Sequence, residues 1–453
     1  MRRLYTLLIY LAVPFAFAIV LWRGLRDRSY WQGLGERFGG GARVGTGARV
    51  GVGSRVGAGS RAGTGARVAS GPSIWLHAVS LGEMSAAAPL VRALRAKYPQ
   101  NPLVLTTATP TGRARAKILF GDTVDVRFLP YDMPGAVRRF LDRIRPRLAI
   151  IMETELWPNL YAECERRGVP LVLASARLSA KSVARYRRFG ALFRGIFSAS
   201  SLIAAQTEGD AERFMAIGAQ SARTHVVGNI KFDVELHGQA TGSARPTWIA
   251  GSTHAGEEEQ VLAAHQALLA DVPDALLILA PRHPDRFRIV ADLLTSRGLR
   301  FTRRSEGATA GGTSAGAAAP ASAAQVLLVD TVGELGALYG AADVAFVGGS
   351  LVPIGGHNLL EPAALGIPVL TGPHYSNGKD IARLLLDRGA ALQVNDAREL
   401  AAAVKRLLAD PTERRRVGAI GREIVEANRG SVARLLALIE ALLREPGTPL
   451  AAA

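Results

Sequence analysis

The sequence contains a single cysteine, Cys164, in 453 residues. An intrachain disulfide is therefore excluded, which agrees with a reducing compartment for the folded part. The usual metal-binding patterns are also absent, because there is no H-E-x-x-H, no pair of cysteines and no D-x-D motif of the kind that holds a metal-nucleotide complex. We therefore expect a function that needs neither a metal ion nor another cofactor.

Acidic residues are scarce relative to basic ones. The chain carries 55 Lys and Arg against 38 Asp and Glu, which gives a formal net charge of +17. This balance favours an anionic partner such as a membrane surface, a nucleotide or a nucleic acid. The basic residues lack the interleaved aromatic platforms on which single-stranded bases stack, so we expect no nucleic-acid partner.

Charge is missing altogether between Leu4 and Trp22, where nearly every residue is apolar. At ~1.5 Å per residue, a helix over this run just crosses the hydrocarbon core of a bilayer. Arginines flank the run on both sides, and their bias weakly places the rest of the chain in the cytoplasm. A cleaved signal peptide is the alternative, but no Ala-x-Ala-like site follows the run. The sequence thus predicts an uncleaved single-pass anchor over residues 1–28.

Glycine is concentrated in two low-complexity segments. Residues 41–70 repeat a hexapeptide of the type GARVGT, with an arginine in register and no acidic residue. Ordering so much glycine is costly in entropy, so residues 29–72 are interpreted as a disordered basic linker. Its arginines serve either in a plain spacer or at a phospholipid surface. The Gly/Ala/Ser/Thr-rich stretch from Gly307 to Ala324 is interpreted as a loop insertion.

Short β-rich runs alternate with helical patterns from Ser73 onward, for example IWLHAV, LVLTTA and LAIIME. The alternation restarts after Pro246 with WIAGS, LLILAP and VAFVGG. This pattern is typical of βαβ units in parallel sheets that are buried on both faces. We predict an α/β protein with two doubly wound Rossmann-like domains, residues 73–240 and 241–445, facing a cleft. Ligands of such sheets bind beyond the carboxyl ends of the strands.

Strand ends in the first half carry carboxylates and an arginine. Glu83 follows IWLHAV at the start of a helix, where it is either a first-turn acidic residue stabilised by the macrodipole or a general base. The run LAIIME leads into Glu153 and Glu155, either of which is a candidate for binding sugar hydroxyls, although a nearby proline also marks a helix boundary. Arg177 follows the next strand and either meets an anionic acceptor or forms a surface salt bridge.

Strand ends in the second half carry groups suited to phosphate. Ser252 and Thr253 follow WIAG and act either as helix N-caps or as phosphate ligands. Arg282 and His283 follow LLILAP, and the planar fork of an arginine suits a phosphate or a carboxylate.

The stretch VAFVGGSLVPIGGHNLLEPAALG is the most informative. Gly355 and Gly356 permit close approach of a ligand to the backbone ahead of a helix expected to begin near Asn358. Free amides there suit a phosphate, and Glu361 one turn later suits a ribose diol. The alternative is a glycine-rich turn with a capping glutamate. No G-K-[ST] and no G-x-G-x-x-G is present at the corresponding places, so the pattern indicates nucleotide-sugar chemistry and not a P-loop or a redox cofactor.

The order of the motifs resembles the bacterial 3-deoxy-D-manno-octulosonic acid (Kdo) transferases, which are GT-B glycosyltransferases. The resemblance is carried by WLHAVSLGE, TTATPTG, METELWPNL, ARLS, GNIKFD, AGSTHAGEE, PRHPDRF and GGSLVPIGGHNLLEPAALG, and it extends to about Pro373. The hexapeptide repeat, the stretch Gly307 to Ala324, and Ser175 in place of the usual Asn depart from the family pattern.

The resemblance implies an inverting, metal-independent transfer of Kdo from CMP-Kdo to the lipid A precursor lipid IVA. It places the enzyme at the cytoplasmic face of the inner membrane, with anionic phospholipids as a further partner. Glu83 would be the catalytic base. The donor would be bound by Ser252, Thr253, Arg282, His283, Gly355, Gly356, Asn358 and Glu361, and the sugar or acceptor by Glu153 and Arg177.

Two other functions remain as alternatives at this point. One is another GT-B enzyme that uses a UDP-sugar, such as a lipid A disaccharide synthase or an epimerase, and the full motif order argues against it. The other is a non-catalytic membrane-bound protein that binds polyanions through its positive charge. Such a protein would need neither Glu83 nor the HNLLEP stretch.

Overall fold

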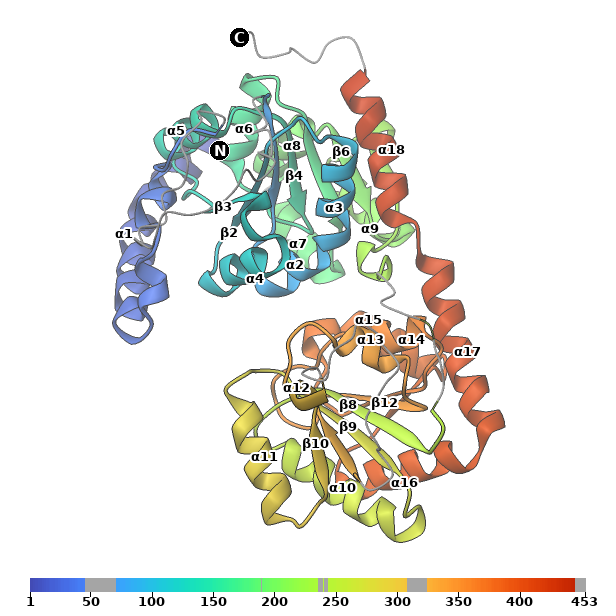
Figure 1. Ribbon diagram of the computed structural model, residues 1–453. Coiled ribbons are helices and arrows are strands. Elements are labelled where there is room, and N and C mark those ends of the chain that lie inside the picture. The colour runs from blue at the N-terminus through green and yellow to red at the C-terminus, as the bar shows by residue number, and fades with distance from the viewer. Residues whose placement is uncertain (45–70, 189, 235–238, 240–242, 308–323, 445–453) are drawn as a thin grey trace. The chain divides into compact units, whose positions relative to one another are not determined.

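The computed structural model describes residues 1–44, 71–188, 190–234, 239, 243–307 and 324–444. The chain divides into two compact units, one formed by Met1–Lys231 with Gly430–Ala453 and the other by Phe232–Arg429. Each unit is built on one parallel sheet covered by helices, which is the α/β architecture expected from the alternation of strands and helices (Figure 1). Most of the hexapeptide repeat and residues 308–323 of the second insertion lie outside the described residues.

The first unit contains a sheet with the strand order β3-β2-β1-β4-β5-β6-β7, in which neighbouring strands are parallel. Its strands are β1 (Ser73–His77), β2 (Leu103–Thr107), β3 (Asp125–Phe128), β4 (Pro146–Met152), β5 (Leu171–Ala176), β6 (Leu202–Ala205) and β7 (Thr224–Val226). Side chains alternate between the faces, so Ile74 and Leu76 of β1 pack into one core cluster while Trp75 packs into the other. Burial of both faces explains the near-continuous apolar runs in the sequence.

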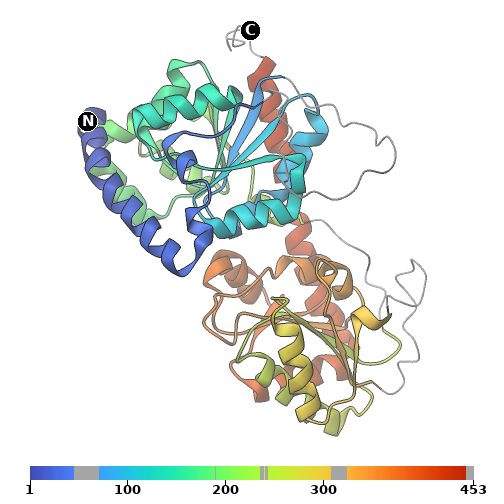
Figure 2. The same cartoon turned by 60° about the vertical axis from the view of Figure 1, so that its left-hand side comes forward.

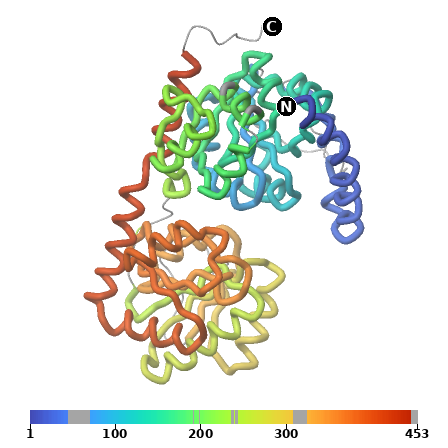
Figure 3. Tube along the Cα trace, turned by 180° about the vertical axis from the view of Figure 1, so that it is seen from behind, coloured from blue at the N-terminus to red at the C-terminus, as the bar shows by residue number. Residues whose placement is uncertain are grey.

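Helices cover both faces of this sheet. They are α2 (Leu81–Ala86), α3 (Ala88–Lys97), α4 (Pro110–Phe120), α5 (Pro134–Ile144), α6 (Pro158–Arg166), α7 (Ala180–Arg188), α8 (Gly190–Ala199), α9 (Glu208–Met215) and α18 (Ser431–Arg444). The last helix, α18, adds Val432, Leu435 and Ile439 to the cluster of Ile74 and packs against α3 (Figure 3). The sequence placed residues 430–444 in the second domain. The structure assigns them to the first unit, because their apolar stripe is buried on the first sheet.

The N-terminal residues also belong to the first unit. They form α1 (Arg2–Arg26) and two short 3-10 helices, η1 (Arg28–Trp31) and η2 (Leu34–Phe38). Glu36 in η2 accepts two hydrogen bonds from Arg113, of 3.1 and 3.0 Å, and one of 2.8 Å from the backbone N–H of Phe128. The first part of the predicted linker 29–72 is therefore ordered, because Glu36 fastens it to α4 through Arg113 and to β3 through Phe128. By length and composition, α1 can cross a membrane.

The second unit repeats the architecture with the strand order β10-β11-β9-β8-β12-β13-β14, again parallel. Its strands are β8 (Thr247–Thr253), β9 (Leu276–Pro281), β10 (Phe301–Arg303), β11 (Val326–Leu328), β12 (Val344–Val347), β13 (Val369–Thr371) and β14 (Ala391–Gln393). Its helices are α10 (Glu258–Asp271), α11 (Arg286–Ser296), α12 (Arg304–Gly307), α13 (Leu335–Tyr339), α14 (Leu360–Ala364), α15 (Lys379–Asp387), α16 (Ala397–Ala409) and α17 (Pro411–Asn428). Trp248 and Ile249 of β8 pack into opposite clusters, so this sheet is also buried on both faces.

Helix α17 approaches the loop after α14 very closely. A Cβ atom added at Gly418 would lie 1.9 Å from the carbonyl oxygen of Gly366. One at Gly421, a turn further along the same helix, would lie 3.4 Å from the Cβ of Ala363, which is an ordinary contact. The close packing of the α17 backbone on the loop after α14 therefore requires glycine at position 418 but not at position 421.

We expect the Gly418→Ala variant to lower the free energy of unfolding of the second unit by about 2–3 kcal/mol, because the backbone must move to admit the methyl group. The matched Gly421→Ala variant should be neutral or gain up to about 1 kcal/mol, because alanine favours the helix over glycine. Guanidinium unfolding followed by circular dichroism measures both. Equal losses for the two variants would contradict the close approach.

Candidate functional site

In the first unit, Glu83 lies at the carboxyl end of β1, in the first turn of α2. Its Oε2 atom accepts a 2.8 Å hydrogen bond from the backbone N–H of Val79, while its own N–H donates to the hydroxyl of Ser80 at 3.4 Å. Ser80 is the N-cap of α2, and the Glu83 carboxylate reaches back to the residue before it, which is a variant of the capping box. Glu83 therefore lies in the first turn and stabilises the start of the helix, as one of the two interpretations from the sequence expected. Burial raises the pKa of the Glu83 carboxyl above its ordinary value, and the nearby Glu153 carboxylate adds to the rise.

Glu153 lies beside it in the turn after β4 and is paired with two cations. Its carboxylate accepts hydrogen bonds from Nε of Arg177 at 2.9 Å and from Nζ of Lys231 at 3.1 Å. The backbone of Glu153 is left-handed, with φ 55°, as is that of Ser175 on the neighbouring strand, with φ 52°. Asparagine adopts this conformation more readily than serine, so the backbone at Ser175 is costly for its residue type.

Glu155 completes a group of carboxylates at this edge of the sheet. Burial, together with the negative charges of Glu83 and Glu153, raises the pKa of the Glu155 carboxyl to about 7. Around neutral pH the Glu155 carboxyl therefore exists in both its protonated and its ionised form. In this arrangement Glu83 can accept a proton while Glu153 keeps its ion pairs with Arg177 and Lys231.

In the second unit, the carboxyl end of β8 carries two small polar residues, Ser252 and Thr253. Ser252 is buried and left-handed, with φ 58°. The hydroxyl of Thr253 is fully buried and finds no hydrogen-bond partner among the described residues. Buried polar atoms are almost always satisfied, so an unpartnered hydroxyl at a strand end is a candidate ligand-binding group.

A buried carboxylate fixes the loop that faces these residues. Glu257 accepts backbone N–H groups from Gly349 at 2.7 Å, Ser350 at 3.0 Å, Leu351 at 2.9 Å and His254 at 3.3 Å. Burial raises the pKa of the Glu257 carboxyl, and these N–H donors oppose the rise because they stabilise the ionised form. The loop after β12 is thereby held against the loop after β8.

Three histidines gather beside Arg282. The Nε2 atoms of His254 and His357 lie 2.8 Å apart and the two ring planes differ by only 6°, so the rings are hydrogen-bonded edge to edge. The ring of His283 stands edge-on to His254 at a centroid distance of 5.3 Å. Burial, together with the nearby Arg282 charge, lowers the pKa of His357 to about 3. Burial also lowers the pKa of His254. The hydrogen-bonded pair of His254 and His357 is therefore neutral near pH 7, and Arg282 supplies positive charge beside it.

The HNLLEP stretch forms a compact turn. Gly355 and Gly356 have φ of 105° and 74°, conformations that favour glycine, and the side chain of Asn377 donates to the Gly356 carbonyl at 3.2 Å. Asn358 donates to Oε1 of Glu361 at 3.0 Å, which joins two of the predicted donor-binding residues directly. Helix α14 begins at Leu360, two residues after Asn358, and is a single short turn.

Both strand-end groups lie where the parallel sheets predict, each within its own unit. Within the described ranges of the chain, no group of three or more His, Cys, Asp or Glu side chains is arranged to hold a metal ion.

Comparison with known proteins decides the family. A model described as 3-deoxy-D-manno-octulosonic-acid transferase matches residues 35–234. The Haemophilus influenzae 3-deoxy-D-manno-octulosonic acid transferase is 43% identical over 82% of this chain and 87% of its own length. The Bordetella pertussis protein of the same name is 41% identical over 81% of this chain and 86% of its own length. This chain belongs to the Kdo transferase family.

The second half of this Kdo transferase matches the model named glycosyl transferases group 1 over residues 319–424. Among solved structures, the UDP-GlcNAc 2-epimerase of Neisseria meningitidis bound to UDP-GlcNAc aligns with a TM-score of 0.51 over 82% of this chain and all of that one, at 13% identity. At this identity the likeness shows the fold alone, and it confirms two Rossmann-like units of the GT-B type. Membership in a glycosyltransferase family argues against the non-catalytic polyanion-binding protein considered above.

Several residues of the two groups were not singled out as site residues from the sequence. Lys231 lies in the GNIKFD motif, but nothing local indicates that it pairs with Glu153, far away in the chain. His254 and His357 are likewise brought together by the fold. Glu257 stands in a run of three glutamates, and such a run at a strand end was a usable signal, since a buried acidic residue there needs backbone donors.

We expect the Thr253→Val variant of this Kdo transferase to keep or slightly raise its melting temperature, because valine has the same shape and removes an unpartnered buried hydroxyl. Binding of CMP should weaken about 5- to 10-fold, the value of one hydrogen bond of about 1 kcal/mol. Calorimetric titration with CMP and thermal unfolding measure the two effects. A large loss of stability with unchanged binding would assign the hydroxyl a purely structural role.

Proposed function

We propose that this member of the family transfers Kdo from CMP-Kdo to the lipid A precursor lipid IVA at the cytoplasmic face of the inner membrane. The observation that carries the proposal is the 43% identity with the Haemophilus influenzae Kdo transferase over most of both chains. The polar groups at the carboxyl edges of the two sheets support it, because they provide a base in one unit and phosphate-binding groups in the other.

Glu83 is proposed as the general base. It takes the proton of an acceptor hydroxyl while the hydroxyl oxygen forms a bond to the anomeric carbon of Kdo. The bond from that carbon to the phosphate oxygen breaks, and CMP leaves with the electron pair. This single displacement inverts the anomeric configuration. Burial, which raises the pKa of the Glu83 carboxyl, makes it a stronger proton acceptor than an exposed carboxylate.

The second unit is proposed to bind the donor and to stabilise the charge that develops on the CMP phosphate. Arg282 supplies the positive charge, since His254 and His357 beside it are neutral near pH 7. Further donors to the phosphate are proposed at Ser252, Thr253, His283 and the backbone amides of Gly355 and Gly356. Asn358 and Glu361, already hydrogen-bonded to each other, are proposed to hold the ribose.

Glu153 and Arg177 are proposed to shape the sugar or acceptor subsite as a pair and not as separate ligands. Their hydrogen bond leaves the Arg177 side chain half-exposed, at 48%, so it can still meet an anionic group. Lys231 adds a second positive charge beside Glu153. Kdo and the lipid A precursor both carry negative charge, which fits this arrangement.

The acceptor is a lipid, so membrane attachment is part of the proposal. The apolar helix α1 provides the attachment, and the exposed basic residues at the end of α7, which are Arg185, Arg187 and Arg188, are suited to lipid phosphates.

The experiment is transfer of Kdo from CMP-Kdo to lipid IVA in detergent with EDTA, with the product counted by mass. We expect the wild-type enzyme to be active and the Glu83→Gln variant to lose at least about 100-fold in kcat. Glutamine retains an oxygen for the N–H of Val79, so the cap and the fold should persist. The matched control is Glu212→Gln, an exposed glutamate on α9 of the same unit.

The pH profile provides a second readout of the base. Glu83 acts only when ionised, and its pKa is raised, so kcat/KM of the wild type should fall with decreasing pH at a higher pH than for an ordinary carboxylate. Full activity of Glu83→Gln would refute the assignment of the base. CMP binding by a folded enzyme that transfers no Kdo would refute the acceptor and favour another nucleotide-sugar reaction.

A further inference from the structure

Helix α1 rests on the first unit along one side. Val13 is buried against Met133 and Ala136, with Ile9 beside it. Four residues further on, Phe17 packs edge-to-face on Phe38 with the ring centroids 5.2 Å apart. Residues 9, 13 and 17 share one side of a helix, so the contact is continuous over this length. Figure 2 shows α1 lying along the flank of the unit.

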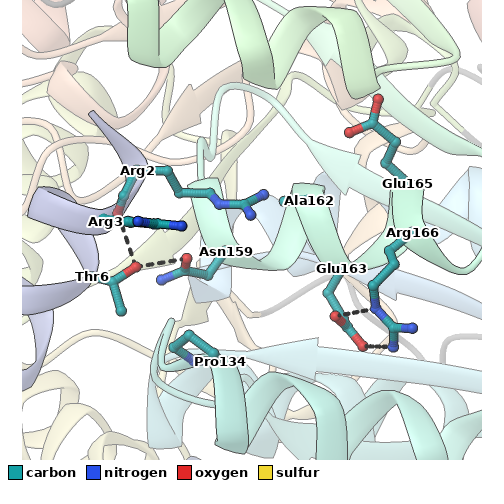
Figure 4. Close-up of a pocket in the computed structure, with 9 residues that line it drawn as sticks. All are labelled: Arg2, Arg3, Thr6, Pro134, Asn159, Ala162, Glu163, Glu165 and Arg166. Atoms are coloured by element: carbon teal, nitrogen blue, oxygen red, sulfur yellow. Dashed lines mark hydrogen bonds and ion pairs between the residues drawn. The ribbon is translucent and has the colours of Figure 1, made fainter.

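The first turn of α1 is fastened to the same unit by polar groups. The hydroxyl of Thr6 lies 2.9 Å from the side-chain oxygen of Asn159 at the start of α6 (Figure 4). Asp132 accepts the backbone N–H of Asn159 at 2.9 Å and also hydrogen-bonds the Tyr5 hydroxyl of α1. The N-terminal end of the helix therefore contacts buried polar atoms that belong to the folded unit.

A pocket beside this contact is lined by charged residues from both elements. Arg2 and Arg3 of α1 face it from one side, and Glu163, paired with Arg166, from the other (Figure 4). Ion pairs and arginine side chains of this kind are found in water or among headgroups and not in hydrocarbon. The start of α1 thus lies at an aqueous surface of the folded unit.

The opposite side of α1 is apolar and uncovered. Residues spaced at i, i+3, i+4 and i+7 from Leu4 lie on that side, and the exposed ones are Leu4, Leu7, Leu8, Leu11, Phe15 and Ile19. An exposed apolar stripe of this length marks an interaction surface. Arginines stand at both ends of the stripe, with Arg2 and Arg3 before it and Arg23, Arg26 and Arg28 after it.

A helix that crosses the bilayer cannot keep these contacts. Crossing would place the first turn on the far side of a hydrocarbon core about 30 Å thick. The first turn and Phe17 both contact one folded unit, so crossing would either carry Asp132 and Asn159 into the hydrocarbon or break the contacts. Buried polar groups are costly there.

We propose that α1 lies in the plane of the membrane surface, with its exposed apolar side in the acyl region and both of its ends on the cytoplasmic side. The occupant of the apolar side is a bilayer with anionic headgroups, because arginines stand at both ends of the stripe. Snorkelling arginines at the two ends then reach phosphates of the same leaflet. This arrangement replaces the single crossing predicted from the sequence. It rests on the proposed attachment to a membrane but not on the donor, the acceptor or the base.

The first test uses cysteine labelling of the full-length chain in cells. The native Cys164 is fully buried, so it provides a silent background. A cysteine inserted directly after Met1 keeps every arginine of α1. We expect a membrane-impermeant maleimide to label the inserted cysteine only after the inner membrane is opened. The control variant Arg187→Cys, on α7, should show the same behaviour. Labelling of the inserted cysteine in intact spheroplasts would overturn the proposal.

The second test measures the docked contact in isolated membranes. Oxidation of a Thr6→Cys/Asn159→Cys double variant should give an intramolecular disulfide, and each single variant should give none. The maleimide test with the cysteine inserted after Met1 needs neither of these substitutions. The topology of α1 can therefore be measured even if the double variant fails to fold. A folded double variant that stays reduced would overturn the docked arrangement.

Flotation with vesicles identifies the occupant of the apolar side. We expect the wild type to float with vesicles that contain phosphatidylglycerol. The vesicle-bound fraction of a Leu11→Glu/Phe15→Glu variant should be at least about 10-fold lower than that of the wild type. A wild type that stays soluble, or that dimerises through this side without binding vesicles, would overturn the proposal. Kdo transfer is not part of any of these readouts, so an inactive enzyme with the expected topology would refute only the proposed reaction.

Discussion

Burial of both faces of a parallel sheet leaves its carboxyl edge as the place where backbone turns and polar side chains reach solvent, and this constraint governs both units. In the first unit the edge carries Glu83, Glu153 and Glu155. In the second it carries Thr253, Arg282 and the hydrogen-bonded histidines His254 and His357. Each group is assembled from turns that follow neighbouring strands, so the strand order decides which side chains meet.

Carboxylates at these two edges serve different purposes because their partners differ. Glu257 accepts four backbone N–H groups and therefore acts as an internal support for a loop. Glu153 is occupied by two cations. Glu83 is held at one oxygen by a single backbone N–H, and burial makes it a better proton acceptor. The negative charge of Glu153 thus stays near the proposed sugar site, while Glu83 remains able to accept a proton.

Local patterns in the sequence were sufficient for the fold class, the two Rossmann-like units and the placement of Glu83, Glu153 and Arg282 at strand ends. They could not reveal which sheet an amphipathic helix covers, so α18 was placed in the wrong unit. Glycine-rich composition hid the ordered turn around Glu36, because its ion pair with Arg113 depends on a residue far along the chain. The hydrogen-bonded pair of His254 and His357 also arises from distant segments.

The return of α18 to the first unit also has a consequence for synthesis. The second unit is one continuous segment, Phe232–Arg429, and can close its core as soon as that segment has left the ribosome. The first unit starts earlier, but its cluster around Ile74 lacks Leu435 and Ile439 until α18 has been synthesised. The core of the first unit is therefore completed only after the whole second unit has been made, so its exposed apolar residues need shielding while the second unit is translated.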